Sequence, residues 1–242
     1  MTKKLTSKNK YTKMQQKYYN EAAATGDGVT VDNVVGSFNQ HNNWWDYNLL
    51  FFRLGGNFKN MKVLDFGCGP GRNIVKYQNK FAQIDGVDIS KNNIKNAKKY
   101  LKKEGITNSK LYVCNGVDLQ NIPDESYDIV MSTVALQHIC VWDIRFNYFK
   151  EFYRILKPKG TIAIQMGFGS PSPSTVYYHE NHYDAPGTNR SFDCEVANPK
   201  QIAKDVYDAG FNWFNYLIGP TGPGDVHPYW IYFNGQKQHN NG

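Results

Sequence analysis

The sequence predicts a single α/β domain whose seven-stranded, mostly parallel sheet carries helices on both faces and has an antiparallel last strand. Apolar runs of strand length alternate with helical segments between residues 61 and 166, which is the pattern of parallel strands joined by helices. Two aromatic runs, at 211–218 and 229–233, are joined by a glycine- and proline-rich link without a helix, so they should pair antiparallel. The length of 242 residues fits one such domain.

The segment before the sheet is expected to contain a tail and two helices. Residues 1–10 are rich in lysine and are predicted to form a disordered basic tail. Residues 11–57 should hold helices at 11–24 and 42–53, because both have helical composition and are followed by glycines.

The sheet domain is expected at 58–233, and each of its elements has a local signal. Its first strand, 61–65, enters a glycine-rich loop that opens a helix at 72–80. Pro158 and Gly160 mark the end of a later helix, because proline cannot continue a helix and glycine favours its end. The other strands of this part are predicted at 83–89, 110–114, 127–133 and 161–166. The other helices are predicted at 91–103, 142–156 and 199–210.

Two further segments lie late in the chain. Residues 167–195 are rich in serine, proline, glycine, tyrosine and histidine without a clear period, so they are predicted to form a long structured insertion. Residues 234–242 should form a polar C-terminal tail. Because long loops are usually functional, the insertion is the first place to look for substrate contacts.

The composition is that of a globular protein, with 40% hydrophobic and 20% charged residues. No apolar run approaches the roughly 20 residues that span a bilayer, and the N-terminus lacks the apolar segment of a secretory signal. The expected location is therefore cytoplasmic. The four cysteines show no CxxC pairing, and a group of His179, His182, Asp184 and His227 lacks a metal-binding signature, so no metal site is expected.

The net charge of +7 raises the question of a nucleic-acid partner. Most of the excess lies in the first 17 residues and along residues 91–103. The second of these runs reads as the polar face of a helix whose buried stripe is Ile94, Ala97 and Leu101. Solvated charge explains both runs, and a nucleic-acid partner is not expected.

A glycine loop at residues 67–71 is the strongest functional signal. Gly67, Gly69 and Gly71 follow a strand and open a helix, the place where an open α/β sheet binds ligands at its carboxyl edge. The spacing is one residue shorter than the GxGxxG of dinucleotide-binding proteins. Asp88 ends the second strand of the core, where a carboxylate can accept hydrogen bonds from both hydroxyls of a ribose.

With these motifs the sequence resembles the class I S-adenosylmethionine-dependent methyltransferases, which have a Rossmann-like fold. The resemblance continues through Asp118-Leu119, Ile122 to Ser132, Leu136 to Ile139 and Arg154 to Gly160. It is close over residues 60–167 and holds in outline over 198–233. The resemblance implies S-adenosyl-L-methionine as cofactor and S-adenosyl-L-homocysteine as product.

The resemblance also implies roles for individual residues. Asp65 would fix the glycine turn and the methionine end of the cofactor, Asp88 would hold the ribose, and Asp118 would accept from the adenine amine. The full expected set of cofactor contacts is Asp65, Gly67, Cys68, Gly69, Gly71, Arg72, Asp88, Ile89, Asp118, Leu119 and Thr133.

His138 is the candidate catalytic base, because it follows the fourth strand and an imidazole pKa suits proton removal near neutral pH. Aromatic residues of the N-terminal segment are expected to form a lid over the cofactor, and those of the insertion are expected to line the acceptor pocket. The lid candidates are Tyr18, Tyr19, Trp44, Trp45 and Tyr47, and the pocket candidates are Tyr177, Tyr178, His179, His182, Tyr183 and Arg190.

The preferred function is methyl transfer to a hydroxyl or amine of a small molecule or sugar. One alternative is a nucleic-acid methyltransferase, but the chain has neither an Asp/Asn-Pro-Pro-Tyr motif nor a Pro-Cys nucleophile after the fourth strand, where Ser132 to Leu136 stand instead. The other alternative is a non-catalytic protein that binds S-adenosylmethionine. The sequence leaves the acceptor and the oligomeric state open.

Overall fold

The structure is a computed structural model that describes residues 2–25, 31–32, 36–37, 47–52, 54–173, 175–179, 193–222 and 227–238. Its centre is a seven-stranded sheet in the order β5-β4-β3-β6-β7-β9-β8. The strands are β3 (Lys62–Phe66), β4 (Gln83–Asp88), β5 (Leu111–Val113), β6 (Tyr127–Ser132), β7 (Leu156–Phe168), β8 (Trp213–Pro220) and β9 (Tyr229–Gln236). Strands β3 to β7 pair in parallel, whereas β9 is antiparallel to both of its neighbours. The predicted fold class is confirmed.

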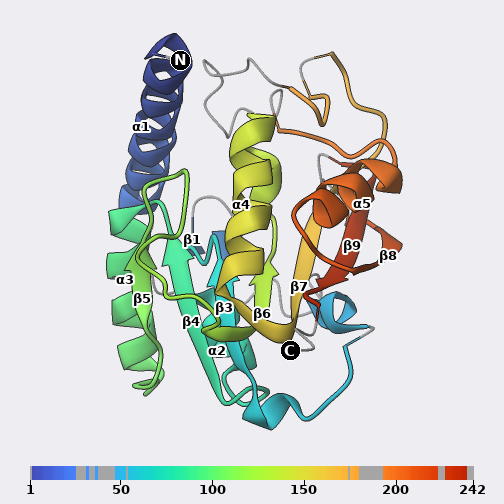
Figure 1. The fold of residues 1–242 in the computed structure, drawn as a ribbon. Helices are drawn as coiled ribbons and strands as arrows, with labels where there is room; N and C mark the ends of the chain where they lie inside the picture. The colour runs from blue at the N-terminus through green and yellow to red at the C-terminus, as the bar shows by residue number, and fades with distance from the viewer. Residues whose placement is uncertain are drawn as a thin grey trace.

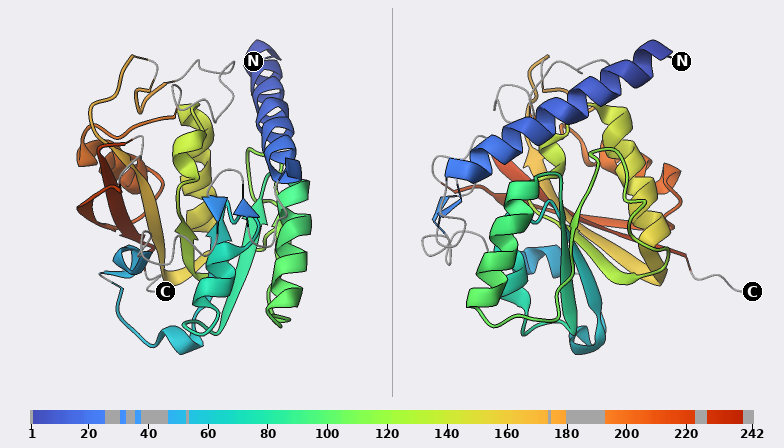
Figure 2. Two further views of the ribbon diagram at one scale, coloured as in Figure 1. Left: turned by 180° about the vertical axis from the view of Figure 1, so that it is seen from behind. Right: turned by 90° about the vertical axis from the view of Figure 1, so that its left-hand side faces the viewer.

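Helices cover both faces of this sheet (Figures 1 and 2). One face carries α2 (Arg72–Tyr77) and α3 (Lys91–Lys103), and the other carries α4 (Trp142–Ile155) and α5 (Pro199–Asp208). Short elements complete the fold: β1 (Val31–Asp32), β2 (Gly36–Ser37), and the 3-10 helices η1 (Tyr47–Phe51), η2 (Phe58–Asn60) and η3 (Leu136–His138).

The central strands are buried on both faces, as parallel strands between two helix layers must be. Along β6, Ile129 and Met131 join the core cluster under α2 and α3, whereas Val130 joins the cluster under α4 and α5. This alternation follows from the two-residue period of a strand. Two hydrophobic cores therefore hold the sheet rigid between them, and the loops at its carboxyl edge are built on a fixed base.

Helix α1 (Thr2–Thr25) lies across the carboxyl edge of the sheet (Figure 2). The prediction of a disordered tail at residues 1–10 is wrong, because the helix begins at Thr2 rather than Tyr11. Its contacts explain why it forms: Lys8 pairs with Asp143 of α4 at 2.9 Å, and Asn96 of α3 donates to the carbonyl of Ala23. Docking on both sides supplies the stability that a polar helix lacks alone.

Other boundaries also differ from the predictions, among them the start of β7, which is Leu156 rather than residue 161. Strand β9 continues to Gln236, so residues 234–236 belong to the sheet rather than to a tail, and Asn234 is fully buried with its amide donating to the carbonyl of Leu50 at 2.8 Å. Of the helix predicted at 42–53, the structure describes the 3-10 helix η1, and residues 42–46 lie outside the described part of the chain.

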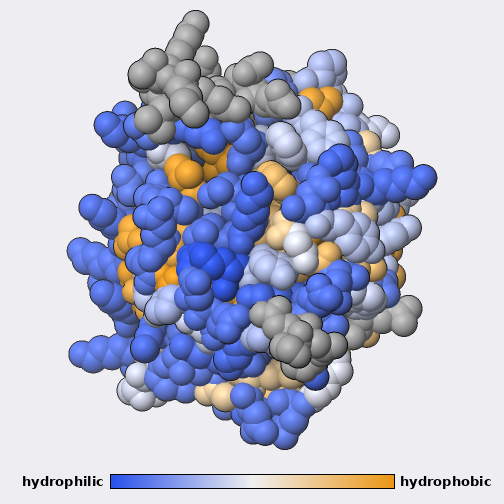
Figure 3. Space-filling view, viewed as in Figure 1, coloured by the Kyte–Doolittle hydropathy of each residue, from blue (hydrophilic) through white to orange (hydrophobic). Residues whose placement is uncertain are grey.

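The surface seen in Figure 3 is mostly hydrophilic, with apolar side chains gathered only in small areas. Within the described part of the chain, no helix combines the length and the apolarity that crossing a membrane requires.

Candidate active site

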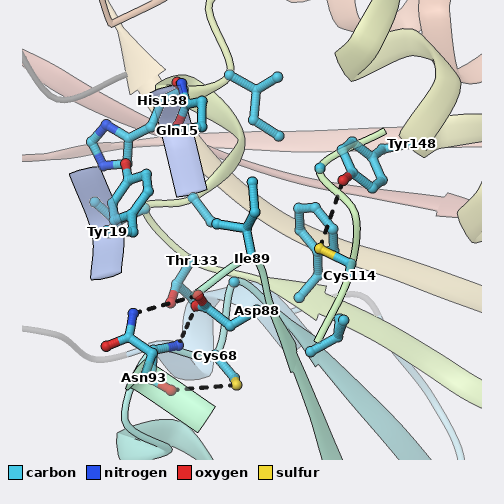
Figure 4. A pocket seen from close by; sticks show the side chains of 18 of the residues that line it. Gln15, Tyr19, Cys68, Asp88, Ile89, Asn93, Cys114, Thr133, His138 and Tyr148 are labelled. Atoms are coloured by element: carbon cyan, nitrogen blue, oxygen red, sulfur yellow. Dashed lines mark hydrogen bonds between the residues drawn. The ribbon is translucent and has the colours of Figure 1, made fainter. Parts of the chain in front are cut away.

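A cavity lies at the carboxyl edge of the sheet, where β3, β4 and β6 end beside one another (Figure 4). Loops after the strands form its floor and walls, and α1 forms its cover. Lining residues after β3 are Phe66, Gly67, Cys68, Gly69, Pro70, Arg72 and Asn73. Those near the ends of β4 and β5 are Val87, Asp88, Ile89, Asn93, Cys114 and Gly116. Those after β6 are Thr133, Val134, Ala135, His138 and Ile139, joined by Tyr11, Gln15, Tyr19 and Tyr148.

The glycine loop is tied to the end of β4 by hydrogen bonds. The amide of Gly67 donates to the carbonyl of Val87 at 2.8 Å, and the amide of Gly69 donates to Asp88 Oδ2 at 2.9 Å. Gly67 has φ +73°, and a Cβ built there would lie 2.4 Å from the Cβ of Ala135. Backbone conformation and close packing therefore both require glycine at this position.

Replacing Gly67 with alanine is expected to lower the melting temperature and to abolish ligand binding in the cavity, because Ala135 must move away. The control is Gly105→Ala, since Gly105 has φ +70° but nothing within 4 Å of the position that a Cβ would take. That control isolates the cost of a positive φ for a residue with a Cβ, about 1–2 kcal/mol. Thermal unfolding of the two variants measures the difference, and equal melting temperatures would contradict the packing argument.

Asp65 ends up beneath the cavity floor rather than in its lining. Its side chain is fully buried, and neither carboxylate oxygen has a hydrogen-bond partner among the described residues. Burial raises the pKa of Asp65 to about 7, although the nearby Asn73 and Arg72 partly oppose this shift. A carboxylate held this way is suited to a cationic ligand, because a positive charge nearby would restore its ionised form.

Asp88 stands at the tip of β4 and lines the cavity. Its Oδ1 accepts the amide of Ser90 at 2.7 Å, while Oδ2 accepts Gly69. The same carboxylate thus fixes the glycine loop and the start of α3, since the side chain of Ser90 caps that helix by accepting the amide of Asn93. Ser90 and Asp88 together fix the two loops relative to each other where they line the cavity.

Most of the predicted cofactor contacts gather in this cavity, but four lie outside its lining. Asp65 and Gly71 are below it, Leu119 is fully buried in the core, and Asp118 turns its carboxylate to the side-chain amide of Asn115 at 2.8 Å. The adenine contact of Asp118 stays a prediction. Thr133 is in the lining and accepts a hydrogen bond from the side chain of Asn73 at 3.0 Å.

The wall beside β5 contains one residue that sequence reasoning missed, Tyr148, next to Cys114, which begins the segment that resembles the family's adenine-contacting stretch. Cys114 and Tyr148 both line the cavity, with Cys114 Sγ 3.8 Å from the Tyr148 hydroxyl (Figure 4). Burial raises the pKa of the Cys114 thiol to about 11, so this wall is neutral at physiological pH. Tyr148 is contributed by α4, far away in the sequence, and no local pattern distinguishes it from the other core aromatics.

Helix α1 covers the cavity with three side chains spaced four residues apart: Tyr11, Gln15 and Tyr19. Gln15 donates from Nε2 to the Tyr11 hydroxyl at 2.7 Å and to the carbonyl of His138 at 3.0 Å. The Tyr11 hydroxyl also accepts the amide of Cys140 at 2.9 Å. The cover is therefore fixed to the turn after β6. The i, i+4, i+8 spacing of Tyr11, Gln15 and Tyr19 puts them on one face of a helix, and this pattern could have predicted the cover from the sequence.

His138 is paired with a carboxylate from the far end of the insertion. Its Nδ1 lies 2.8 Å from Asp193 Oδ1, and Asp193 is 2% exposed. A carboxylate only accepts, so the proton sits on Nδ1 and the lone pair of the neutral ring is on Nε2. Nε2 is buried and has no hydrogen-bond partner among the described residues. The ring lies beside Tyr19, with centroids 6.3 Å apart (Figure 4).

The other predicted lid and acceptor residues divide into two groups. Tyr177 is buried against α5, where its hydroxyl donates to Asp205 Oδ2 at 2.7 Å, and Tyr178 donates to the carbonyl of Gln201. Neither tyrosine, nor His179, is in the lining of the cavity, and the predicted lid residue Tyr18 is exposed and also outside it. Trp44, Trp45, His182, Tyr183, Asp184 and Arg190, and the side chain of Tyr47, lie outside the described part of the structure.

Comparison with known proteins connects this geometry to a family. Residues 64–164 match the family model for a methyltransferase domain. Sterol 24-C-methyltransferase erg6 of Aspergillus fumigatus is 35% identical over 107 residues, which cover 43% of this chain and 27% of that protein. The chain therefore matches only about a quarter of the length of that relative.

Two further likenesses extend over more of the chain. The ubiquinone/menaquinone biosynthesis C-methyltransferase UbiE of Pectobacterium carotovorum is 22% identical over 200 residues, covering 75% of this chain and 77% of that protein. Phosphoethanolamine N-methyltransferase 2 of Haemonchus contortus, solved in complex with S-adenosyl-L-methionine, superimposes with a TM-score of 0.63 at 19% identity. That superposition covers 92% of this chain and 56% of the other, and it shows a shared fold.

Proposed function

We propose that this chain, which contains a methyltransferase domain of the class I fold, transfers a methyl group from S-adenosyl-L-methionine to a small molecule. The observation that carries the proposal is the pair of His138 and Asp193. It places an imidazole in the wall of the cavity that the glycine loop forms, with Nε2 unpartnered among the described residues.

The residues present fit this cofactor. S-Adenosylmethionine is cationic at its sulfonium and its amino group, and Asp65 is a fully buried carboxylate whose burial outweighs the opposing effects of the nearby Asn73 and Arg72. At Gly69 no other atom lies within 4 Å of the position that a Cβ would take, so the loop leaves free space at this point. Asp65 and this loop would hold the methionine end and Asp88 the ribose. The neutral wall of Cys114 and Tyr148 would face the adenine.

The chemistry divides between the cofactor and the protein. When bound, S-adenosylmethionine supplies an electrophilic methyl group on its sulfonium. His138 would take the proton that an acceptor hydroxyl or ammonium group must lose, using the Nε2 lone pair. Asp193 would keep the ring in the required tautomer and stabilise the imidazolium that forms. Tyr11 and Gln15 would hold the backbone of the base, because both contact the carbonyl of His138.

The acceptor we propose is a hydroxyl or amine of a small molecule or sugar. Side chains of helix α1 lie over part of the cavity, which supports a small acceptor rather than a nucleic acid. A second candidate is transfer to carbon, which is favoured by the names of the sterol and quinone C-methyltransferases that the chain matches. The atom that receives the methyl group would be identified by NMR of the product.

The test uses mixtures of small metabolites, freed of macromolecules, with either ordinary or methyl-deuterated S-adenosylmethionine. The proposal predicts a product whose mass shifts by the label, formed together with S-adenosylhomocysteine. DNA and RNA are offered in parallel at low and high salt. Labelling of nucleic acid alone would show a nucleic-acid methyltransferase, and cofactor binding without any labelled product would show a non-catalytic binding protein.

A further inference from the structure

A second histidine–carboxylate pair lies next to the first and outside the cavity lining. His227 precedes β9 and is 6% exposed, with Nδ1 3.0 Å from Glu195 Oε1. Its Nε2 lies 3.2 Å from Nε2 of Gln137, the residue before His138. Gln137 is 1% exposed and Glu195 8%, so the whole group is shielded from water.

The proton positions in this group follow from its contacts. Gln137 Oε1 accepts the amide of Gly167 at 3.1 Å, so its amide nitrogen must face His227. That nitrogen only donates, and His227 Nε2 must therefore accept. The remaining ring proton sits on Nδ1 and is donated to Glu195. The hydrogen bonds run in one direction, from Gly167 through Gln137 and His227 to Glu195.

The strand β7 has a gap in its side chains that accommodates this ring. A Cβ built at Gly167 would lie 2.4 Å from three atoms of the His227 ring, so only glycine leaves room for it. Trp230 packs against the ring edge-to-face, with centroids 5.3 Å apart. Burying an imidazole and a carboxylate costs desolvation that an apolar pair would not, so stability alone is a weak reason for this arrangement.

One four-residue segment, 193–196, connects the two histidine pairs. Asp193 contacts His138, and Glu195 contacts His227. Between them, the amide of Cys194 donates to the carbonyl of Gln137 at 2.8 Å. The turn η3 is thus held by its main chain through Cys194 and by its Gln137 side chain through His227.

We propose that His227 is a positioning residue for the reaction: through Gln137 it fixes the turn η3, and so the direction in which His138 presents Nε2. Glu195 serves by holding His227 in the tautomer that accepts from Gln137. This inference rests on the proposed function, in which His138 is the base. It assigns to His227 no contact with the cofactor or the acceptor.

Two substitutions of His227 separate its two hydrogen bonds. In His227→Gln the terminal amide reaches the position of Nε2, so its oxygen can still accept from Gln137. In His227→Asn the amide occupies the position of Nδ1, so the contact with Glu195 is kept and that with Gln137 is lost. The inference predicts that kcat of the asparagine variant is at least about tenfold below that of the glutamine variant, because misplacement of a catalytic group lowers the rate. The KM for S-adenosylmethionine should be equal in both.

The same substitutions in a His138→Ala background test the coupling. If His138→Ala lowers kcat and the asparagine and glutamine variants then become equal, both proposals stand. If His138→Ala leaves kcat unchanged, the proposed function fails. If His138→Ala lowers kcat but the two single variants of His227 are equal, only the inference fails.

A measurement on the unaltered protein does not depend on how the variants fold. Long-range proton–nitrogen NMR of the histidine-labelled chain at neutral pH should show His227 as the neutral Nδ1–H tautomer. A ring that carries its proton on Nε2, or on both nitrogens, would overturn the inference, because it could not accept from Gln137.

Discussion

Replacing His138 with alanine is expected to lower kcat by about 10²–10⁴-fold, the usual contribution of a general base. The affinity for S-adenosylmethionine should stay within about threefold of the original, because His138 is proposed to take a proton from the acceptor and not to bind the cofactor. In a His138→Gly variant, added imidazole should restore part of the rate. Full activity of His138→Ala would contradict the proposed role of this residue.

Asp193 should show a related but smaller effect. Asp193→Ala removes the acceptor that holds the proton on Nδ1, so part of the His138 population would present a protonated Nε2. We expect kcat to fall by at least about tenfold, less than for loss of the base itself. Asp128→Ala is a matched control at the opposite end of β6, where the carboxylate pairs with Lys157 at 2.9 Å. A loss of kcat shared by both variants would indicate a general effect on the fold.

The second large effect is the pH dependence of cofactor binding through Asp65. Its pKa is about 7 in the unliganded protein, and a bound cation should lower it. The cofactor then binds the ionised form, and its affinity should rise by about eightfold between pH 6 and 7.5 as that form becomes populated. Asp65→Asn should bind more weakly and lose this dependence. Calorimetric titration between pH 6 and 7.5 measures the affinity and its change with pH. If the affinity of Asp65→Asn changed with pH as much as that of the original chain, the role assigned to Asp65 would be contradicted.

The same pKa has a consequence for stability. The unfolded chain releases this proton near pH 4 and the folded chain near pH 7, so the folded state binds more protons in between. The contribution of Asp65 to the free energy of unfolding therefore falls as pH rises from 4 to 7. Without cofactor, Asp65→Asn should melt at a higher temperature than the original chain above pH 7, with the difference vanishing towards pH 4.

Asp85→Asn is the matched control for this experiment, because Asp85 is an equally buried carboxylate of the sheet. Its oxygens are fully engaged, accepting the amide of Lys110 at 2.7 Å and the hydroxyl of Tyr127 at 2.8 Å. Loss of these hydrogen bonds should lower the melting temperature. A stabilised Asp85→Asn would show that neutralising any buried carboxylate has the effect assigned to Asp65.

Local signals predicted the sheet domain well, because its elements alternate and begin or end at recognisable residues. Helices α3 and α5 begin at Lys91 and Pro199 as predicted, where the structure shows that Ser90 and Asn198 cap them, and the floor of the cavity follows from the strand ends. Helix α1 was underestimated, since its first ten residues have no apolar stripe; Lys8 pairs with Asp143 of α4, and the later part of the helix contacts α3. Composition alone cannot show contacts of that kind.

The site was predictable only as far as it is local. The glycine loop and Asp88 lie within one strand–helix–strand unit, so their spacing in the sequence was enough to predict that they lie at the same site. Asp193 is 55 residues from His138, and His227 is 90 residues from Gln137, so only the folded chain reveals these pairs. The insertion was expected to contribute aromatic side chains, yet its described end contributes carboxylates to two histidines instead.

The central claim is that the cavity at the glycine loop binds S-adenosylmethionine, and calorimetric titration of the full chain tests it most directly. The account predicts one binding site per chain, occupied also by S-adenosylhomocysteine and weakened at least about tenfold by Asp88→Ala, which removes a buried hydrogen-bonding carboxylate from the site. Circular dichroism of that variant would show whether its fold is kept. No binding by the unaltered chain, or binding that a folded Asp88→Ala variant leaves unchanged, would contradict the account.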